Sequence, residues 1–198
     1  MKTKMIILLV LLMGMIVSGC SENGTEQSSS ENYSTSESSN IFKPVNSDTI
    51  FLKRNVSGLS GETYSLSMPS DWIEETDLLS YNEDLEFMVG NKEETEFVAC
   101  IVENKQDFTS IDAYTQLVAE NLSDLNEKEI MFDDQQINGV SGKVCQFSSE
   151  ASGVKLTYIY YITETDTHYV QLFGWTFTRL FETSHDQLEA IMNSFNTK

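Results

Sequence analysis

The stretch EIMFDDQQINGVSGKVCQFS, residues 129–148, contains the strongest hairpin signal of the chain. At its centre is Asn138-Gly139, a dipeptide that tolerates a positive φ at both central positions of a tight turn. Further segments rich in β-branched and aromatic residues follow, each after a short polar turn. The expected strands are 129–137, 140–148, 154–163 and 168–177. This half of the chain is therefore predicted to form a meander of four antiparallel strands.

The chain before this meander also predicts strands. In residues 63–68 the apolar side chains alternate with polar ones, which is typical of a half-buried strand, and Pro69 ends the segment. Residues 97–102 are apolar at every position, so this strand is expected at the centre of a sheet. The expected strands in this part are 50–52, 63–68, 85–89 and 96–103.

Two amphipathic helices complete the pattern. In the first, Thr109 and Asp112 fit a capping box; in the second, Thr183 with Asp186, or Ser184 with Gln187, would cap the N-terminus. The apolar stripes recur at spacings of three and four and consist of Ile111, Tyr114, Val118, Leu122 and Leu125, then Leu188, Ile191, Met192 and Phe195. Each stripe needs a sheet face to cover, so the sequence predicts an α+β fold with helices on the faces of an antiparallel sheet.

Two segments resemble the ends of a known domain family. Residues 64–72, YSLSMPSDW, resemble the strand–Pro–x–x–Trp opening of PsbP-like domains, with Asp71 where that family often has Gly. Residues 188–195 look like the final helix of the family. The resemblance implies a three-layer α/β/α sandwich built on a mainly antiparallel sheet over residues 47–198. It also implies an extrinsic, membrane-associated binding or assembly role, and it supplies no catalytic residue.

The N-terminus has the layout of a secretory signal. Lys2 and Lys4 precede an apolar run over residues 5–17, which is too short for a comfortable membrane span. Residues 17–20, VSGC, resemble the bacterial lipobox, in which a diacylglycerol with palmitate-like acyl chains is attached to the cysteine. We therefore expect a lipoprotein signal peptide at 1–19, lipid on Cys20, and a location on the extracytoplasmic face of a bacterial cell membrane. The alternative is an ordinary cleaved signal with an incidental cysteine.

Composition predicts a tether between the anchor and the domain. Residues 20–46 are rich in Ser, Asn and Thr and cannot bury apolar surface, so we expect a flexible acidic tether. Removal of residues 1–19 takes away two lysines and no acidic residue, so the formal net charge falls from −19 to −21. A chain this acidic is not expected to bind nucleic acid.

The sequence contains no convincing set of catalytic or zinc-binding residues. Ser184-His185-Asp186 contains hydrolase residue types, but consecutive residues cannot converge as a triad does, and helix capping is the better explanation. His168 is expected to be an exposed loop residue. With two histidines and no His-x-x-x-His or Cys-x-x-Cys motif, a zinc site is not expected. We predict no catalytic, cofactor-binding or metal-binding residue.

Acidic residues cluster at three places in the chain. Close carboxylates could perform acid–base chemistry or bind Ca²⁺, but none has the spacing of a calcium loop, and a solvated face is the simpler explanation. The clusters are Glu74, Glu75 and Asp77; Glu93, Glu94 and Glu96; and Asp133 with Asp134.

Cysteines and aromatic residues leave two alternatives open. Cys100 and Cys145 lie on expected strands in an oxidising compartment, so they form a candidate disulfide; otherwise they are two small buried side chains. The strand aromatics could line a ligand groove, although core packing is commoner. These aromatics are Trp72, Trp175, Tyr158, Tyr160, Tyr161 and Phe173.

The sequence thus favours a non-enzymatic, lipid-anchored binding or assembly domain that meets an unknown protein or ligand of the cell envelope. A hydrolase that acts through acidic residues is one alternative, and it requires two convergent carboxylates of raised pKa. A divalent-cation-binding module is the other.

Overall fold

A computed structural model describes residues 49–197, apart from 59–62, 80–83 and 138–139. The predicted signal peptide (1–19), the predicted lipid-attachment residue Cys20, the predicted tether (20–46) and the Asn138-Gly139 turn all lie outside the described residues. Within the described part of the chain, no helix has the length and apolar character needed to cross a membrane.

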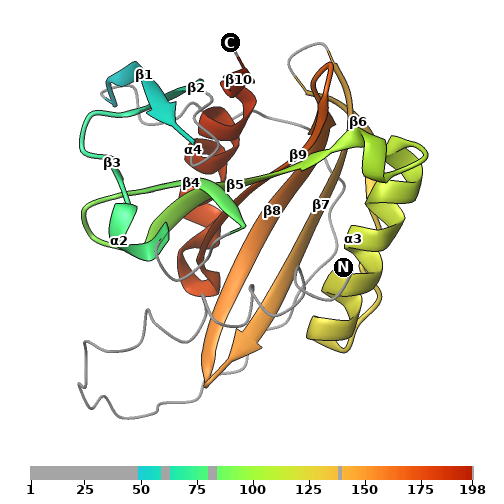
Figure 1. The fold of residues 1–198 in the computed structure, drawn as a ribbon. Coiled ribbons are helices and arrows are strands. Elements are labelled where there is room, and N and C mark those ends of the chain that lie inside the picture. Colours follow the sequence, from blue (N-terminus) through green and yellow to red (C-terminus); the bar gives the residue numbers. More distant parts are fainter. Residues whose placement is uncertain (1–48, 59–62, 80–83, 138–139, 198) are drawn as a thin grey trace.

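The centre of the molecule is a seven-stranded antiparallel sheet (Figure 1). Its strand order is β3-β4-β5-β9-β8-β7-β6, with every neighbouring pair antiparallel. The bounds are β3 Ile73–Glu74, β4 Leu85–Gly90, β5 Glu96–Asn104, β6 Asp133–Ile137, β7 Val140–Ala151, β8 Val154–Glu164 and β9 His168–Phe177. The meander β6-β7-β8-β9 is therefore confirmed, and β5 lies inside the sheet as its unbroken apolar run predicted. Strand β6 is shorter than expected because the chain at 129–132 is not in the sheet.

A second, smaller sheet was not foreseen. It has the order β1-β2-β10, formed by Phe51–Ser57, Thr63–Pro69 and Asn196–Thr197. The last two residues of this sheet come from the C-terminus, where Asn196 pairs with Ser65 of β2. A two-residue strand has too little sequence to show a period, so only its tertiary pairing reveals it.

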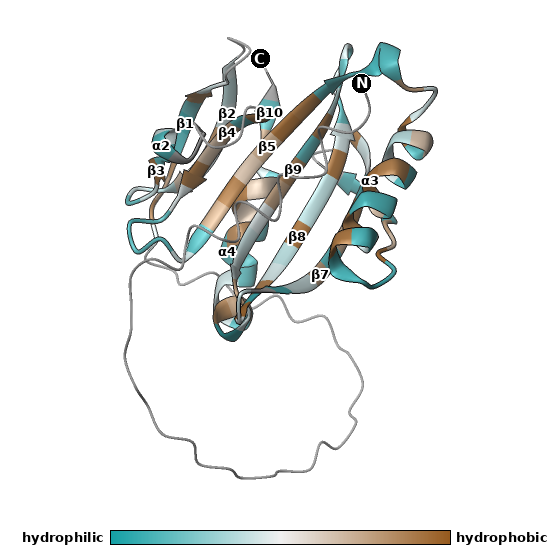
Figure 2. Cartoon of the chain, turned by 60° about the horizontal axis from the view of Figure 1, so that its bottom comes forward, coloured by the Kyte–Doolittle hydropathy of each residue, from teal (hydrophilic) through white to brown (hydrophobic). Residues whose placement is uncertain are grey.

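Two long helices lie on opposite sides of the seven-stranded sheet (Figures 1 and 2). Helix α3, Ile111–Asn126, packs on β7 and β8, and helix α4, Phe181–Asn193, packs on β9, β5 and β2. The shorter helical segments are α2 Thr76–Leu79, η1 Lys105–Asp107 and η2 Thr178–Leu180. With the small sheet beside α4, the molecule has the α/β/α layers and the α+β class that were predicted.

Both predicted helix caps were misplaced. The N-cap of α3 is Ser110, whose Oγ accepts from the Ala113 backbone N–H at 3.2 Å, one residue away from the expected Thr109. Helix α4 begins at Phe181 with no side-chain cap, because the 3₁₀ turn η2 leads directly into it. The predicted capping pairs, Thr183 with Asp186 and Ser184 with Gln187, therefore lie inside the helix.

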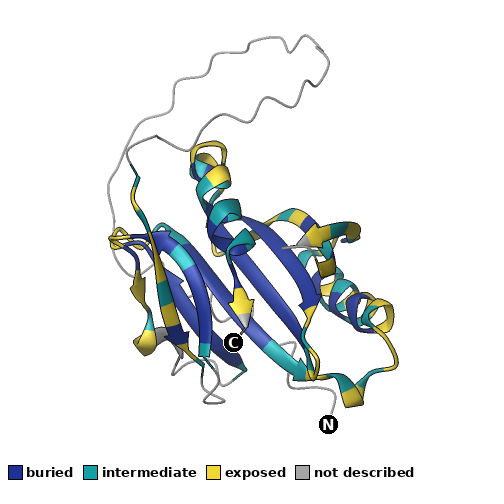
Figure 3. Ribbon diagram, turned by 90° about the horizontal axis from the view of Figure 1, so that it is seen from above, coloured by how far each residue is buried: buried dark blue, intermediate teal, exposed yellow. Residues whose placement is uncertain are grey.

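Alternation along the strands gives the sheet two distinct faces, which we name after the helix on each. On the α4 face, Val98, Cys100, Val170 and Leu172 join the buried side chains of β2 and α4. On the α3 face the buried side chains of the same strands are mainly aromatic and pack with Tyr114, Val118 and Leu122. Figure 3 shows these central strands in the dark blue of buried residues, and Figure 2 shows α3 alternating between apolar and polar ribbon.

Close packing holds α4 on its face. A Cβ added at Gly174 of β9 would lie 2.9 Å from Met192 Sδ, so the absence of a side chain there lets the helix approach the sheet. Glu96, at the start of β5, accepts hydrogen bonds from Ser184 Oγ at 2.5 Å and from Gln187 Nε2 at 2.7 Å. Apolar contact and hydrogen bonding therefore fix the same helix.

Candidate functional site

The aromatic residues proposed for a groove divide between the two faces. Trp72 and Tyr161 belong to the α4 face, whereas the other four belong to the α3 face. There they extend into a continuous set of ring contacts, with centroid separations of 5.2 Å for Phe97–Trp175 and 5.0 Å for Phe147–Tyr158. We call this set the aromatic row: Phe97, Phe147, Tyr158, Tyr160, Phe173 and Trp175.

A buried polar cluster lies at one end of the aromatic row. Tyr114 of α3 donates to Glu103 Oε2 at 2.7 Å, and Gln171 Nε2 donates to the Tyr114 hydroxyl at 2.6 Å and to Glu103 Oε2 at 3.2 Å. Tyr160 donates to Gln171 Oε1. The cluster joins α3 to β5, β8 and β9, and every one of its four side chains has a partner.

Burial controls the ionisation of this cluster. Desolvation raises the pKa of Glu103, and the hydrogen bonds from Tyr114 and Gln171 partly oppose that rise. Burial likewise raises the pKa of Tyr114 far above its ordinary value, reinforced by the neighbouring Glu103 carboxylate. Burial also raises the pKa of Tyr160. The hydroxyls of Tyr114 and Tyr160 are therefore neutral donors at physiological pH, which suits a structural link between helix and sheet.

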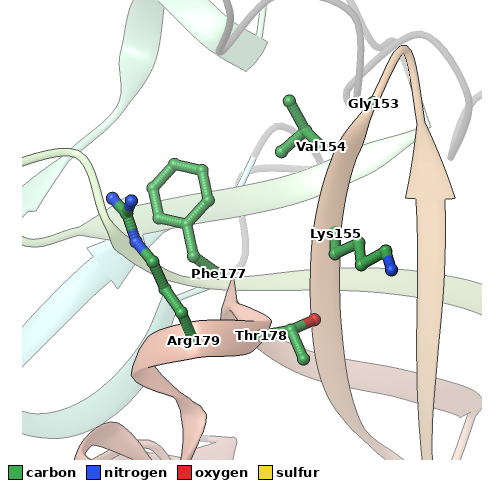
Figure 4. A pocket seen from close by; sticks show the side chains of 6 residues that line it. All are labelled: Gly153, Val154, Lys155, Phe177, Thr178 and Arg179. Carbon is green, nitrogen blue, oxygen red and sulfur yellow. The ribbon is translucent and has the colours of Figure 1, made fainter. Parts of the chain in front are cut away.

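A pocket of about 540 Å³ lies at the other end of β9 (Figure 4). It is lined by Gly153, Val154, Lys155, Phe177, Thr178 and Arg179. Val154 and Phe177 are half-buried and pack against the α3-face core, so the pocket continues the apolar surface of the aromatic row. Its volume falls within the range of roughly 300–1,000 Å³ that is usual for small-molecule sites.

The β7–β8 turn and the end of β9 shape this pocket. Ser152 and Gly153 have φ values of 53° and 80°, the positive pair that a two-residue hairpin turn requires, and they link Ala151 to its partner Val154. On the other strand, the Thr178 hydroxyl accepts a hydrogen bond from Thr157 Oγ1 at 3.0 Å, which holds η2 against β8. The backbone on both sides of the pocket is therefore held by strand pairing and by this hydrogen bond.

Two cations line the pocket, and their surroundings differ. Lys155 Nζ lies 3.6 Å from Glu150 Oε2. The Arg179 guanidinium lies 5.3 Å from the centroid of the Phe177 ring, and no carboxylate among the described residues pairs with it. In Figure 4 the Arg179 side chain runs beside Phe177, on the side of the strands from which Val154 projects, whereas Lys155 projects to the other side.

The candidate triad residues do not converge. Ser184 donates to Glu96, while His185 Nδ1 lies 3.1 Å from Asp186 Oδ1, so the serine and the histidine have different partners. His168 is half-buried rather than exposed, pairs with Asn104 as the first residue of β9, and contacts the Thr167 hydroxyl at 2.8 Å.

The acidic clusters do not form a metal site in the described part of the chain, where no group of three or more potential ligands comes together. Glu75 has a raised pKa because of burial first and the charges of Glu94 and Asp77 second. The other carboxyl of raised pKa, Glu103, has different neighbours, Asp84 and Asp107, so the two do not share a site. Lys143 forms ion pairs with both Asp134 of β6 and Asp112 in the first turn of α3. Its Nζ lies 2.6 Å from Asp134 Oδ1 and 2.7 Å from Asp112 Oδ1.

The candidate disulfide is not formed. Cys100 and Cys145 are both free and buried, the first on the α4 face and the second on the α3 face. Their strands, β5 and β7, are separated by β9 and β8. At about 4.8 Å between neighbouring strands they are roughly 14 Å apart, twice the reach of a disulfide. Burial raises the pKa of both thiols, to about 12 for Cys145, which keeps them neutral.

Arg179 was missed when the sequence was taken alone. The pocket forms only when the β7–β8 turn meets the end of β9, and no local pattern joins positions 153–155 to 177–179. One signal was present, because Arg179 directly follows a strand and lies in a chain with 12 basic and 31 acidic residues.

No protein-family model matches the chain, and no curated protein matches its sequence. Solved structures of similar fold include the Mycobacterium tuberculosis protein LpqN, described as involved in cell envelope biogenesis, with 14% identity, a TM-score of 0.52, and coverage of 77% of this chain and 94% of that one. They also include cyanobacterial PsbP from Synechocystis sp., with 11% identity, a TM-score of 0.44 and coverage of 79% and 99%.

A third similar structure, a Bacteroides thetaiotaomicron protein, has 18% identity and a TM-score of 0.48. The match covers 68% of this chain but only 45% of that protein. At 14% identity the likeness to LpqN is a likeness of fold alone.

Proposed function

We propose that this chain is a lipid-anchored, non-enzymatic binding domain on the extracytoplasmic face of a bacterial cell membrane, where it binds a ligand or partner of the envelope. The pocket at the end of the aromatic row carries the proposal, because it combines an apolar wall with a cation that has no acidic partner among the described residues. The signal-and-lipobox pattern around Cys20 supports the location, and the fold shared with LpqN agrees with it.

The arrangement of carboxyl groups supports binding over hydrolysis. An acid-dependent hydrolase would need two carboxyls that face one substrate atom with separated pKa values. Glu75 and Glu103 have raised pKa values but different neighbours, and Glu103 is already held by Tyr114 and Gln171. Neither of them lines the pocket.

The anchor is tested by mass spectrometry of the full chain expressed in a bacterium and extracted from its membranes. We expect a polypeptide that begins at Cys20 and carries the mass of a diacylglycerol, and the variant Cys20→Ala should lack that mass. An unmodified Cys20 in the wild-type product would contradict the proposed anchoring.

Binding at the pocket is tested by native mass spectrometry of the same extracted protein. We expect a non-covalent adduct in the wild type that is lost in Val154→Trp, since the indole would fill the pocket while an aromatic residue remains compatible with a strand. Leu52→Trp, at an exposed position of β1, is the matched control. Absence of any adduct, or its persistence in Val154→Trp, would refute binding at this site.

A further inference from the structure

We infer that the pocket binds a small anionic amphiphile, in which a phosphate or carboxylate group faces Arg179 and an attached apolar group lies against Phe177 and Val154. This inference rests on the proposed binding function and names the chemical class of the ligand. It follows from three observations: a guanidinium that has no ion pair among the described residues, an apolar wall that leads to the aromatic row, and the charge of the whole chain.

The unpaired guanidinium is the first feature. Arg179 has no carboxylate partner among the described residues, although the acidic residues of the chain outnumber the basic ones by 31 to 12. Lys105, Lys143 and Lys155 each have a carboxylate oxygen within 4 Å, whereas the contact of Arg179 is the Phe177 ring. A guanidinium presents a planar fork of N–H donors that matches carboxylate and phosphate oxygens in a bidentate manner.

The apolar wall is the second feature. Phe177 and Val154 are half-buried and join the core of the α3 face, where Trp175 and Phe173 follow at alternate positions of β9. An aromatic ring beneath a guanidinium also holds its plane in one orientation, since a cation over a ring face is attracted by the ring quadrupole. A ligand with an apolar group would therefore gain contact area beside the anion it presents.

The charge of the chain is the third feature. A body with a formal net charge of −19 repels anions at long range, and that repulsion is screened over about 8 Å in physiological salt. Anions are thus selected by local donors alone, and in the pocket that donor is Arg179, which has no ion pair among the described residues. Apolar contact then supplies affinity and the guanidinium supplies selectivity.

Isothermal titration calorimetry on the full chain in nanodiscs of a zwitterionic lipid tests this inference. The probes are phenyl phosphate, benzoate and the neutral benzyl alcohol, with empty nanodiscs as the blank. We expect both anions to bind at least about tenfold more tightly than the alcohol, since a charge-assisted hydrogen bond is the difference. The tighter of the two anions identifies the group, phosphate or carboxylate.

Three variants locate the selectivity. Arg179→Gln should reduce the binding of both anions to the level of benzyl alcohol, and Arg179→Lys should restore part of it because the charge remains without the fork. Lys53→Gln removes an equal charge from β1, where the lysine is exposed and has no ion pair among the described residues, and should change nothing.

Equal binding of charged and neutral probes would overturn the inference, as would the absence of heat with every probe or equal losses in Arg179→Gln and Lys53→Gln. The proposed function fails separately. If the native adduct disappears in Val154→Trp but persists in Arg179→Gln, the pocket binds a ligand and the ligand is not anionic.

Discussion

The two faces of the seven-stranded sheet use the same strands for different purposes. On the α4 face the side chains are largely aliphatic, and a helix and a second sheet cover them at close range, as the contact between Gly174 and Met192 shows. On the α3 face the same strands carry a row of stacked rings, with a hydrogen-bonded cluster around Gln171 at one end and a pocket beside Phe177 at the other. We therefore propose that the α4 face mainly provides stability and that the α3 face carries the binding site.

The largest effect should come from the α4 face. Leu188→Ala removes a fully buried side chain between α4 and the sheet, and we expect a loss of about 3 kcal/mol in the free energy of unfolding because the closed packing cannot collapse into the cavity. Leu122→Ala, near the end of α3, should cost about 1 kcal/mol less, since one end of that helix can shift inward. Urea unfolding of the full chain measures both, and equal losses would remove the distinction between the faces.

A smaller effect should follow from breaking the polar cluster. Tyr114→Phe removes the hydroxyl that donates to Glu103 and accepts from Gln171, so we expect a loss of about 1–2 kcal/mol. Tyr169 is the control: it stacks on Tyr114 at 4.8 Å and its hydroxyl makes no hydrogen bond among the described residues. If Tyr169→Phe proves as damaging as Tyr114→Phe, the rings matter and the hydrogen bonds do not.

The pH dependence of stability tests the contribution of Glu103 to the same polar cluster. Burial raises the pKa of Glu103 above 4.5 in the folded chain, so the folded state binds this proton more tightly than the unfolded state does. Stability from this group is present at low pH and falls as the pH rises from about 4.5 through the folded-state pKa. Unfolding midpoints should therefore decline more steeply over that interval in the wild type than in Glu103→Gln. Parallel curves would show that Glu103 does not contribute.

The smallest effect on stability should come from the pocket itself. Arg179 is exposed and has no ion pair among the described residues, so Arg179→Gln should change the free energy of unfolding by less than about 1 kcal/mol, the scale of an exposed cation–π contact. A melting temperature close to that of the wild type, combined with lost anion binding, separates recognition from folding. A strongly destabilised variant would place Arg179 among the structural residues.

Patterns of short period predicted most of the fold. The unbroken apolar run 97–102 identified a central strand, and the spacing of Leu188, Ile191 and Met192 identified the second helix and its buried side. These features depend on neighbours one to four residues away, so they are visible in a linear sequence. The small sheet was missed because its closing strand joins residue 196 to residue 65.

The site was less predictable, because it depends on how distant strands are paired. Whether Cys100 and Cys145 share a face follows from the pairing register across β5, β9, β8 and β7 and not from either residue's surroundings in the sequence. Arg179 meets the β7–β8 turn only through the pairing of β8 with β9, in which Leu156 faces Phe177.

The most direct test of the division between the two faces is a ¹⁵N–¹H NMR titration of the full chain in nanodiscs with phenyl phosphate. The predicted result is a set of shifted amides confined to the pocket segments 153–155 and 177–179 and to the neighbouring aromatic row, with the amides of α4 and β2 unchanged. Shifts centred on α4 and the small sheet, or no shifts at all, would contradict the assignment of binding to the α3 face.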